Sequence, residues 1–269
     1  MSNALATTQS LLSQMTLSHG PVGVLGRTVL LCDTLARRCG VALSIVTPDA
    51  FLAANRANKS SWLPLLKLFD CRFNDLSSDN SLFLLGRNRE GDIVACQAAR
   101  SYVWEGTNFK DEAESLRMLY RDPAAMKEPN EKYSVSSLAA KGTEGRVVYS
   151  GAAWYRRDYR GKGLVEWLPR IARAYARGVW DSRTTVTIMS EENVAKGVFP
   201  RNGYRNIEWA VHLRNRDWGD VRYAYLWLKE DEMLDDLRQF LAGHAAGDVA
   251  LGAVRAEHQS ISAAGHARQ

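Results

Sequence analysis

The sequence is poor in the residues that build metal centres and disulfide frameworks. It has four cysteines and five histidines among 269 residues. The cysteines show no CxxC spacing and no nearby histidine pattern; they are Cys32, Cys39, Cys71 and Cys96. Four of the histidines fall in expected tails, and His212 alternates with apolar neighbours in a predicted strand. We therefore expect buried reduced thiols, a structural His212 and no metal site.

Long apolar runs and early basic residues are also missing. No stretch is apolar for long enough to require a membrane span. The first 25 residues contain no Lys or Arg and no sustained apolar core, so a secretory signal is not expected. These absences favour a cytoplasmic protein without a membrane partner.

The charged residues that are present do not form a block. The formal net charge is +5 and the isoelectric point is near 9.0. The basic residues are spread along the chain, and no base-reading or aromatic-stacking motif accompanies them. The positive net charge would suit nucleic-acid binding, but no motif supports this function, so we do not expect it.

Hydrophobic periodicity predicts strands and helices throughout residues 27–242. The predicted strands cover residues 41–47, 81–88, 92–104, 147–155, 184–189, 207–213 and 221–227. The predicted helices cover residues 27–38, 48–58, 62–69, 110–120, 164–179, 191–201 and 233–241. Thr47 is a predicted N-cap before Pro48, and Pro169 is expected to kink the helix from Leu164 or delay its start.

The two ends of the chain differ in composition from this middle part. Residues 1–26 mix polar residues with short apolar patches, which predicts a flexible segment. Residues 243–269 are rich in Ala, Gly and His, and we expect a disordered tail after Gly243.

The stretch with the clearest chemical pattern joins the strand at 147–155 to the helix from Leu164. It reads Arg160, Gly161, Lys162, Gly163. Glycine lets a backbone approach a ligand closely, and the first N–H groups of a helix have no internal partner. The pattern thus indicates an anion cradle. The alternative is a tight turn with solvated basic side chains.

This loop resembles the pyrophosphate loop of the GNAT N-acetyltransferase superfamily, which reads Q/R-x-x-G-x-G/A. Arg160 opens the match, and Val165 stands where Gly or Ala is usual. A second resemblance, to the segment N-x-x-A-x-x-x-Y-x-x-x-G-F, is carried by Asn193, Ala195, Phe199, Gly203 and Tyr204. Phe199 takes the position that often holds a tyrosine general acid. Together the resemblance spans about residues 41–228.

The resemblance implies a mixed α/β (α+β) fold with a mostly antiparallel central sheet flanked by helices. The acyltransferase domain would be residues 27–242, with an extension at each end. The co-substrate would be acetyl-CoA or another acyl-CoA, and the acceptor a small-molecule or peptide amine. The implied cofactor-binding residues are Tyr155, Arg160, Gly161, Lys162, Gly163, Leu164, Val165 and Asn193.

The implied reaction is direct attack of the amine on the thioester. Glu105, at the start of the long connection over residues 105–145, is a candidate general base, or else a solvated loop carboxylate. Ser190 is a candidate proton donor to the leaving thiolate, or else a helix N-cap. The connection itself is expected to cover the acceptor side. A module that binds acyl-CoA without transferring the acyl group is the alternative function, favoured by Val165 and Phe199.

Overall fold

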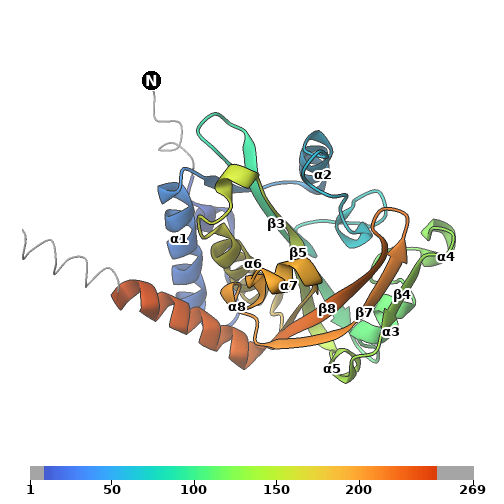
Figure 1. Cartoon of the computed structure of the whole chain (residues 1–269). Helices are drawn as coiled ribbons and strands as arrows, with labels where there is room; N and C mark the ends of the chain where they lie inside the picture. Colours follow the sequence, from blue (N-terminus) through green and yellow to red (C-terminus); the bar gives the residue numbers. More distant parts are fainter. Residues whose placement is uncertain (1–8, 247–269) are drawn as a thin grey trace, which may run out of the picture.

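The structure, a computed structural model, describes residues 9–246, and within them the strands form one eight-stranded sheet (Figure 1). The strand order is β1-β2-β3-β5-β6-β8-β7-β4. The strands are β1 (Ala42–Ile45), β2 (Ser81–Arg87), β3 (Ile93–Trp104), β4 (Lys132–Val135), β5 (Gly145–Tyr155), β6 (Thr184–Ser190), β7 (Asn206–Asn215) and β8 (Gly219–Lys229). Neighbours pair antiparallel except β5 and β6, which are parallel. This confirms the predicted mixed, mostly antiparallel sheet.

Helices lie on both faces of this sheet. The α-helices are α1 (Val22–Arg38), α2 (Pro48–Ala57), α3 (Phe109–Glu114), α4 (Pro123–Met126), α5 (Leu138–Lys141), α6 (Leu164–Trp180), α7 (Glu191–Ala195) and α8 (Val198–Arg201), followed by a C-terminal helix over residues 230–246. Short 3-10 helices are η1 (Leu11–Gln14), η2 (Lys67–Phe69) and η3 (Arg157–Tyr159). No helix within residues 9–246 combines the length and the hydropathy that crossing a bilayer would take.

Two hydrophobic cores lie on opposite faces of the sheet, because successive strand residues point to opposite sides. The α2-face core joins α2, α3 and η2 to the sheet through residues such as Phe51, Phe69, Phe83, Phe109, Tyr149 and Tyr225. The α6-face core joins α1, α6 and the C-terminal helix to the sheet through residues such as Leu25, Val29, Val148, Leu168, Leu226 and Leu237. The sheet is therefore the middle layer of three.

The expected helix starts at α2 and α6 are both found. The Thr47 hydroxyl accepts a hydrogen bond from the Ala50 N–H (3.3 Å), and Pro48 begins α2. Helix α6 begins directly after Gly163, so Pro169 lies inside the helix and does not delay its start.

Three predicted helices differ in the structure. Residues 62–69 form only the short η2, because Pro64 lacks an N–H group and disfavours helical backbone at the residue before it. The helix predicted over 110–120 ends at Glu114, and Leu116 has a positive φ of 63°. The helix predicted over 191–201 divides into α7 and α8 at Gly197, whose φ is 68°.

The ends of the folded part also differ from the prediction. Residues 9–26 pack onto the domain, with Leu11 fully buried, and α1 begins at Val22 rather than at residue 27. The C-terminal helix continues past Gly243 to residue 246. The remainder of the two predicted tails lies outside the described residues. The connection over 105–145 contains β4, an edge strand that sequence patterning missed.

Candidate functional site

The two parallel strands in the middle of the sheet separate part-way along their length. Strand β5 pairs with β6 only from Val147 to Tyr149, opposite Thr184 to Val186. Both strands then continue, β5 to Tyr155 and β6 to Ser190. One edge of each strand therefore lacks a strand partner beyond this point, and the sheet is open between them.

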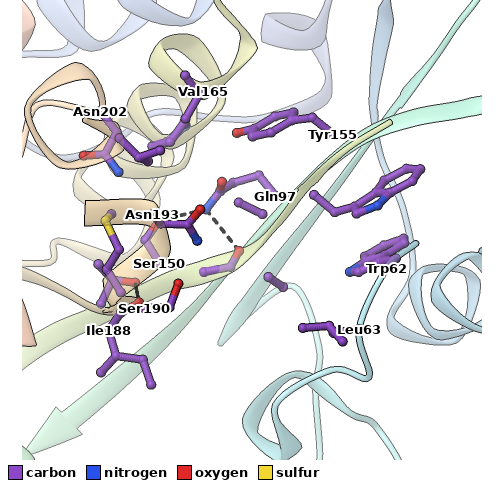
Figure 2. Close-up of a pocket in the computed structure, with 18 of the residues that line it drawn as sticks. Trp62, Leu63, Gln97, Ser150, Tyr155, Val165, Ile188, Ser190, Asn193 and Asn202 are labelled. Atoms are coloured by element: carbon purple, nitrogen blue, oxygen red, sulfur yellow. Dashed lines mark hydrogen bonds between the residues drawn. The ribbon is translucent and has the colours of Figure 1, made fainter. Parts of the chain in front are cut away.

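A cavity of about 730 Å³ occupies this opening. Its walls include residues of the α2-face core, such as Trp62 and Tyr149, and of the α6-face core, such as Leu164 and Tyr204. Figure 2 shows Trp62 and Leu63 on one side of the cavity, Val165 and Asn202 on the other, and Ser150 and Gln97 between them. Because the two cores lie on opposite faces, the cavity passes through the sheet.

A bulge in β5 shapes the wall of the cavity. Gly151 pairs with Ala98 and Trp154 with Cys96, so two residues of β5 face Gln97 alone. Ala152, within this bulge, has a φ of 51°. A bulge re-aims the strand locally.

Gln97 secures the bulge from the neighbouring strand. Its side-chain amide donates to the Ser150 hydroxyl (3.0 Å; Figure 2) and to the Gly151 carbonyl (3.1 Å). The Cys96 thiol donates to the Ala152 carbonyl (3.0 Å). The bent part of β5 is thus held by side chains of β3 rather than by regular strand pairing alone.

The start of α6 forms the wall of the cavity on the α6 face. Gly161 and Gly163 both have positive φ angles, of 78° and 89°. Leu164 and Val165, the first two helical residues, line the cavity. Their N–H groups have no partner within the helix, and the helix dipole adds positive potential there.

Side-chain charge at this end of the cavity is mainly positive. The charged residues that line it are Arg160, Lys196, Arg201 and Glu192, and Glu192 is ion-paired with Lys196. Arg160 is anchored through a hydrogen bond from its Nε to the Tyr155 carbonyl (3.1 Å). Three cations against one carboxylate at a helix start provide an environment that favours an anionic group.

Most residues proposed from the sequence meet at this cavity. Tyr155, Arg160, Gly161, Leu164, Val165, Ser190 and Asn193 line it. Lys162 and Gly163 do not. The Lys162 ammonium instead lies over the Tyr159 ring, 4.2 Å from its centroid.

Gly163 has a packing role that the sequence did not reveal. A Cβ added there would lie 2.3 Å from the Trp167 ring. Gly163 therefore lets the first turn of α6 close over a buried tryptophan. The cradle glycine open to a ligand is Gly161, where an added Cβ would meet nothing within 4 Å.

Glu105 lies at the wrong end of the sheet to act at this cavity. It follows Trp104, which pairs with Gly145 at the beginning of β5, whereas the cavity is lined by the second half of β5. Glu105 is also exposed and does not line the cavity. Glu105 is therefore too far along β3 to act as a general base at this cavity.

Ser190 and Tyr223 place two hydroxyl groups side by side. They are direct partners across β6 and β8, so their side chains project from the same face, and both line the cavity. Ser190 occupies the N-cap position of α7, but its side chain makes no capping hydrogen bond. Burial raises the pKa of Tyr223, which keeps its phenol protonated at neutral pH. Both hydroxyls can therefore donate hydrogen bonds into the cavity.

Phe199 lies outside the cavity. It is half-buried and packs against the α6-face core, and it does not contribute to the cavity wall.

Several buried polar atoms of the cavity wall have no hydrogen-bond partner within the described chain. They are Gln97 Oε1, the Tyr155 hydroxyl, Asn202 Oδ1 and the Tyr204 hydroxyl. Burial raises the pKa of Tyr155, so its hydroxyl also stays protonated. Buried polar groups in native proteins are nearly always satisfied, by protein, water or ligand. Among the polar side chains that line the cavity, Ser190 and Asn193 can both donate and accept hydrogen bonds.

Sequence reasoning missed part of this wall. Gln97, Ser150 and Tyr223 lie in strands whose pattern indicates only burial. Trp218 stands in the turn between β7 and β8, and an aromatic residue in a polar turn was a usable signal. Residues 62–66 belong to the helix predicted over 62–69, although their apolar side chains and Pro64 also suit an extended wall.

The described residues contain no group of three or more His, Cys, Asp or Glu side chains that could hold a metal ion. Cys32 and Cys96 are buried free thiols, whereas Cys39 and Cys71 are only half-buried. His212 is exposed on β7 and pairs with Asp220.

No model of a known protein family matches the sequence, and no curated protein matches it. Solved structures with a similar fold include an uncharacterised protein from Bacillus halodurans, 13% identical with a TM-score of 0.45, covering 76% of this chain and 91% of that chain. A GNAT-family acetyltransferase from Streptococcus pneumoniae is 12% identical with a TM-score of 0.41, covering 70% and 99%. A mutant spermidine N-acetyltransferase from Vibrio cholerae is 9% identical with a TM-score of 0.43, covering 73% and 97%. GNAT acetyltransferases are thus among the structures that this chain resembles.

Proposed function

We propose that this protein is an acyl-CoA-dependent N-acyltransferase that moves an acyl group to an amine. The observation that carries the proposal is the opening between β5 and β6, where a cavity connects a positively charged helix start on one face with an apolar recess on the other. A long acyl donor that is anionic at one end and carries its acyl group at the other end would match the two ends of this cavity.

The positively charged end suits the pyrophosphate of the donor. Gly161 allows close approach of the backbone, and the Leu164 and Val165 N–H groups lie beside it. The unpaired edge of β5 and the side-chain amide of Asn193 suit the amide groups of the pantetheine arm. Acetyl-CoA or another acyl-CoA is therefore the proposed co-substrate.

The chemistry proposed for the opening is direct transfer. The amine nitrogen bonds to the thioester carbonyl carbon, the carbon–sulfur bond breaks, and the sulfur leaves as a thiolate. Ser190 or Tyr223 supplies a proton to that sulfur and regains one from the solvent that accepts the amine proton. The proton lost by the amine passes to water, because Glu192, the carboxylate in the cavity wall, is already paired with Lys196.

A melting experiment tests the proposed donor. A ligand that binds only the folded state adds about 2.7 kcal/mol at a hundred times its dissociation constant. Acetyl-CoA and longer acyl-CoA should therefore raise the melting temperature, and amines should then release free CoA thiol. Absence of any shift at millimolar acetyl-, propionyl- and longer acyl-CoA would reject the assignment.

Two glycine variants show whether the donor binds at the α6 start. Gly161 and Gly91 both have positive φ, of 78° and 88°, and an added Cβ would meet nothing within 4 Å at either. Alanine should cost each about 1 kcal/mol of stability through backbone strain. Only Gly161→Ala should weaken acyl-CoA binding, measured by calorimetric titration. Equal affinities in the two variants would remove the loop from the site.

A non-catalytic acyl-CoA-binding module is the second candidate. Val165 lines the cavity where the resembling family has a small residue, and Phe199 brings no hydroxyl to it. Binding of acyl-CoA without thiol release against any amine of a broad panel would favour the module over the enzyme.

A further inference from the structure

The two halves of the cavity differ in chemistry. All four charged residues of its wall belong to the loop before α6 and to the segment 191–201, which contains α7 and α8. The half on the α2 face is formed by the segment 61–69, the turn between β7 and β8, and neighbouring strand residues. Its principal side chains are Trp62, Leu63, Leu65, Phe69, Trp218 and Val221. None of these can carry charge.

We propose that this uncharged half is a subsite for an apolar or aromatic group beside the reacting carbonyl, and that it rejects polyamines. The group would come from the body of the acceptor amine or from the acyl chain of the donor. The inference rests on the proposed acyl transfer. The nearest carboxylates, Asp217 and Glu128, are paired with Lys67 and do not line the cavity. A second ammonium group placed here would therefore lose its hydration without gaining a free carboxylate, whereas an apolar group gains from leaving water.

One wall of the subsite is fixed by aromatic stacking. The Trp62 ring stacks on Trp154, with centroids 5.2 Å apart and planes 8° from parallel. The Trp154 indole N–H donates to the Ser61 carbonyl (2.9 Å). The extended segment 61–66 is thereby attached to β5 next to the bulge.

The opposite wall is fixed by a buried lysine. The Lys67 ammonium contacts Asp217 (2.6 Å), beside Trp218 in the β7–β8 turn, and also Glu128 (3.1 Å). Lys67 is itself almost fully buried. These contacts hold both apolar walls in place within the free protein, which lowers the entropy cost of binding a rigid apolar group.

Leu63 offers a way to change the subsite without disturbing the core. It lines the cavity beside Trp62 (Figure 2), yet 62% of its surface is exposed. A carboxylate at this position should repel apolar groups and attract a polyamine. Leu138 is a matched control, because it is 83% exposed, apolar and outside the cavity.

The experiment measures release of CoA thiol in two arms with the full chain. The first arm gives acetyl-CoA with either 2-phenylethylamine or spermidine, and the second gives methylamine with either octanoyl-CoA or acetyl-CoA. We expect kcat/KM to favour the apolar partner at least about tenfold in one arm. A gain in the first arm places the apolar group on the acceptor, and a gain in the second places it on the acyl chain.

The variants then connect the preference to the subsite. Leu63→Glu should reduce the apolar preference about tenfold, and Leu138→Glu should leave it unchanged. Equal or better use of spermidine by the unmodified chain, or no gain in either arm, would overturn the inference while leaving acyl transfer standing.

A different outcome is expected if the protein does not bind acyl-CoA at all. If acyl-CoA does not shift the melting temperature, acyl transfer is rejected, and the subsite is tested alone by titrating 2-phenylethylamine and octanoate into the unmodified chain and Leu63→Glu. Binding that the variant weakens would support the subsite, and absence of binding would overturn it.

Discussion

At the scale of single residues, the two glycines before α6 have separate roles. Gly163→Ala should destabilise the fold by at least about 2 kcal/mol, since it combines backbone strain at a φ of 89° with a contact 2.3 Å from the Trp167 ring. Urea unfolding measures the loss. Gly161→Ala carries the strain without the contact and should lose less. Equal losses would mean that the ring moves aside without cost.

The hydroxyl groups at the opening give a second prediction at this scale. Ser190→Ala should lower kcat about tenfold with the acyl-CoA affinity unchanged, because a thiolate leaves readily and needs only modest help from an acid. Phe199→Tyr is the control: it adds a hydroxyl to a residue that does not line the cavity and should leave kcat unchanged. Steady-state rates with a saturating amine measure both. A large gain in Phe199→Tyr would mean that the ring reaches the sulfur.

At the scale of elements, the β7–β8 turn depends on the Lys67 ammonium. Burial lowers the pKa of Lys67, but hydrogen bonds to Asp217 and Glu128 raise it further, so the net pKa lies above the usual 10.5. The stabilisation from this charge is therefore complete below pH 10.5 and is lost as the pH rises through the higher pKa of the folded state.

Lys67→Met tests this contribution. At pH 8 the variant should lose about 2 kcal/mol of unfolding free energy, because two carboxylates lose their buried partner. The difference from the unmodified chain should shrink as the pH rises above 10.5, measured by urea unfolding between pH 8 and 11.5. A difference that stays constant over this range would show that the ammonium charge is not responsible.

Elements defined by local pattern were predictable from the sequence, and those defined by distant partners were not. The apolar strand at 147–155, the glycines after it and the helical spacing of apolar residues in α6 predict a strand, a loop and a helix within some thirty residues. By contrast, β4 has four residues and depends on pairing with β7. Lys67 lies 150 residues from Asp217, so nothing near residues 61–69 indicates that they form a wall.

The sequence likewise predicted the parts of the candidate site that have a local pattern, but not the parts that depend on distant strands. The loop and Ser190 adjoin a strand end and a helix start, which the sequence marks. The place where β5 and β6 separate lies just before the bulge opposite Gln97, and both features depend on pairing between distant strands. The prediction that Glu105 acts at the site was wrong because β3 runs antiparallel to β5. The end of β3, and Glu105 after it, therefore lie at the opposite end of the sheet from the cavity.

At the scale of the whole molecule, the C-terminal helix is joined to the cavity wall through one carboxylate. Asp236 accepts hydrogen bonds from Arg170 (2.7 and 3.0 Å) and from Arg173 (3.1 Å), and all three side chains are buried. Arg173 also donates to the carbonyl of Asn202, which lines the cavity (2.6 Å). Gly203 leaves room for this carboxylate, because a Cβ there would lie 2.5 Å from its oxygens.

Asp236→Asn should therefore destabilise the protein by about 3 to 5 kcal/mol, because it leaves two buried guanidinium groups without a counter-charge. Asp235→Asn is the control from the next position. Asp235 pairs with Arg205 (2.6 Å), but both side chains are more than 40% exposed, so the change should cost no more than about 1 kcal/mol. Urea unfolding measures both. Equal losses would mean that Arg170 and Arg173 find other partners and that the cavity wall does not depend on the C-terminal helix.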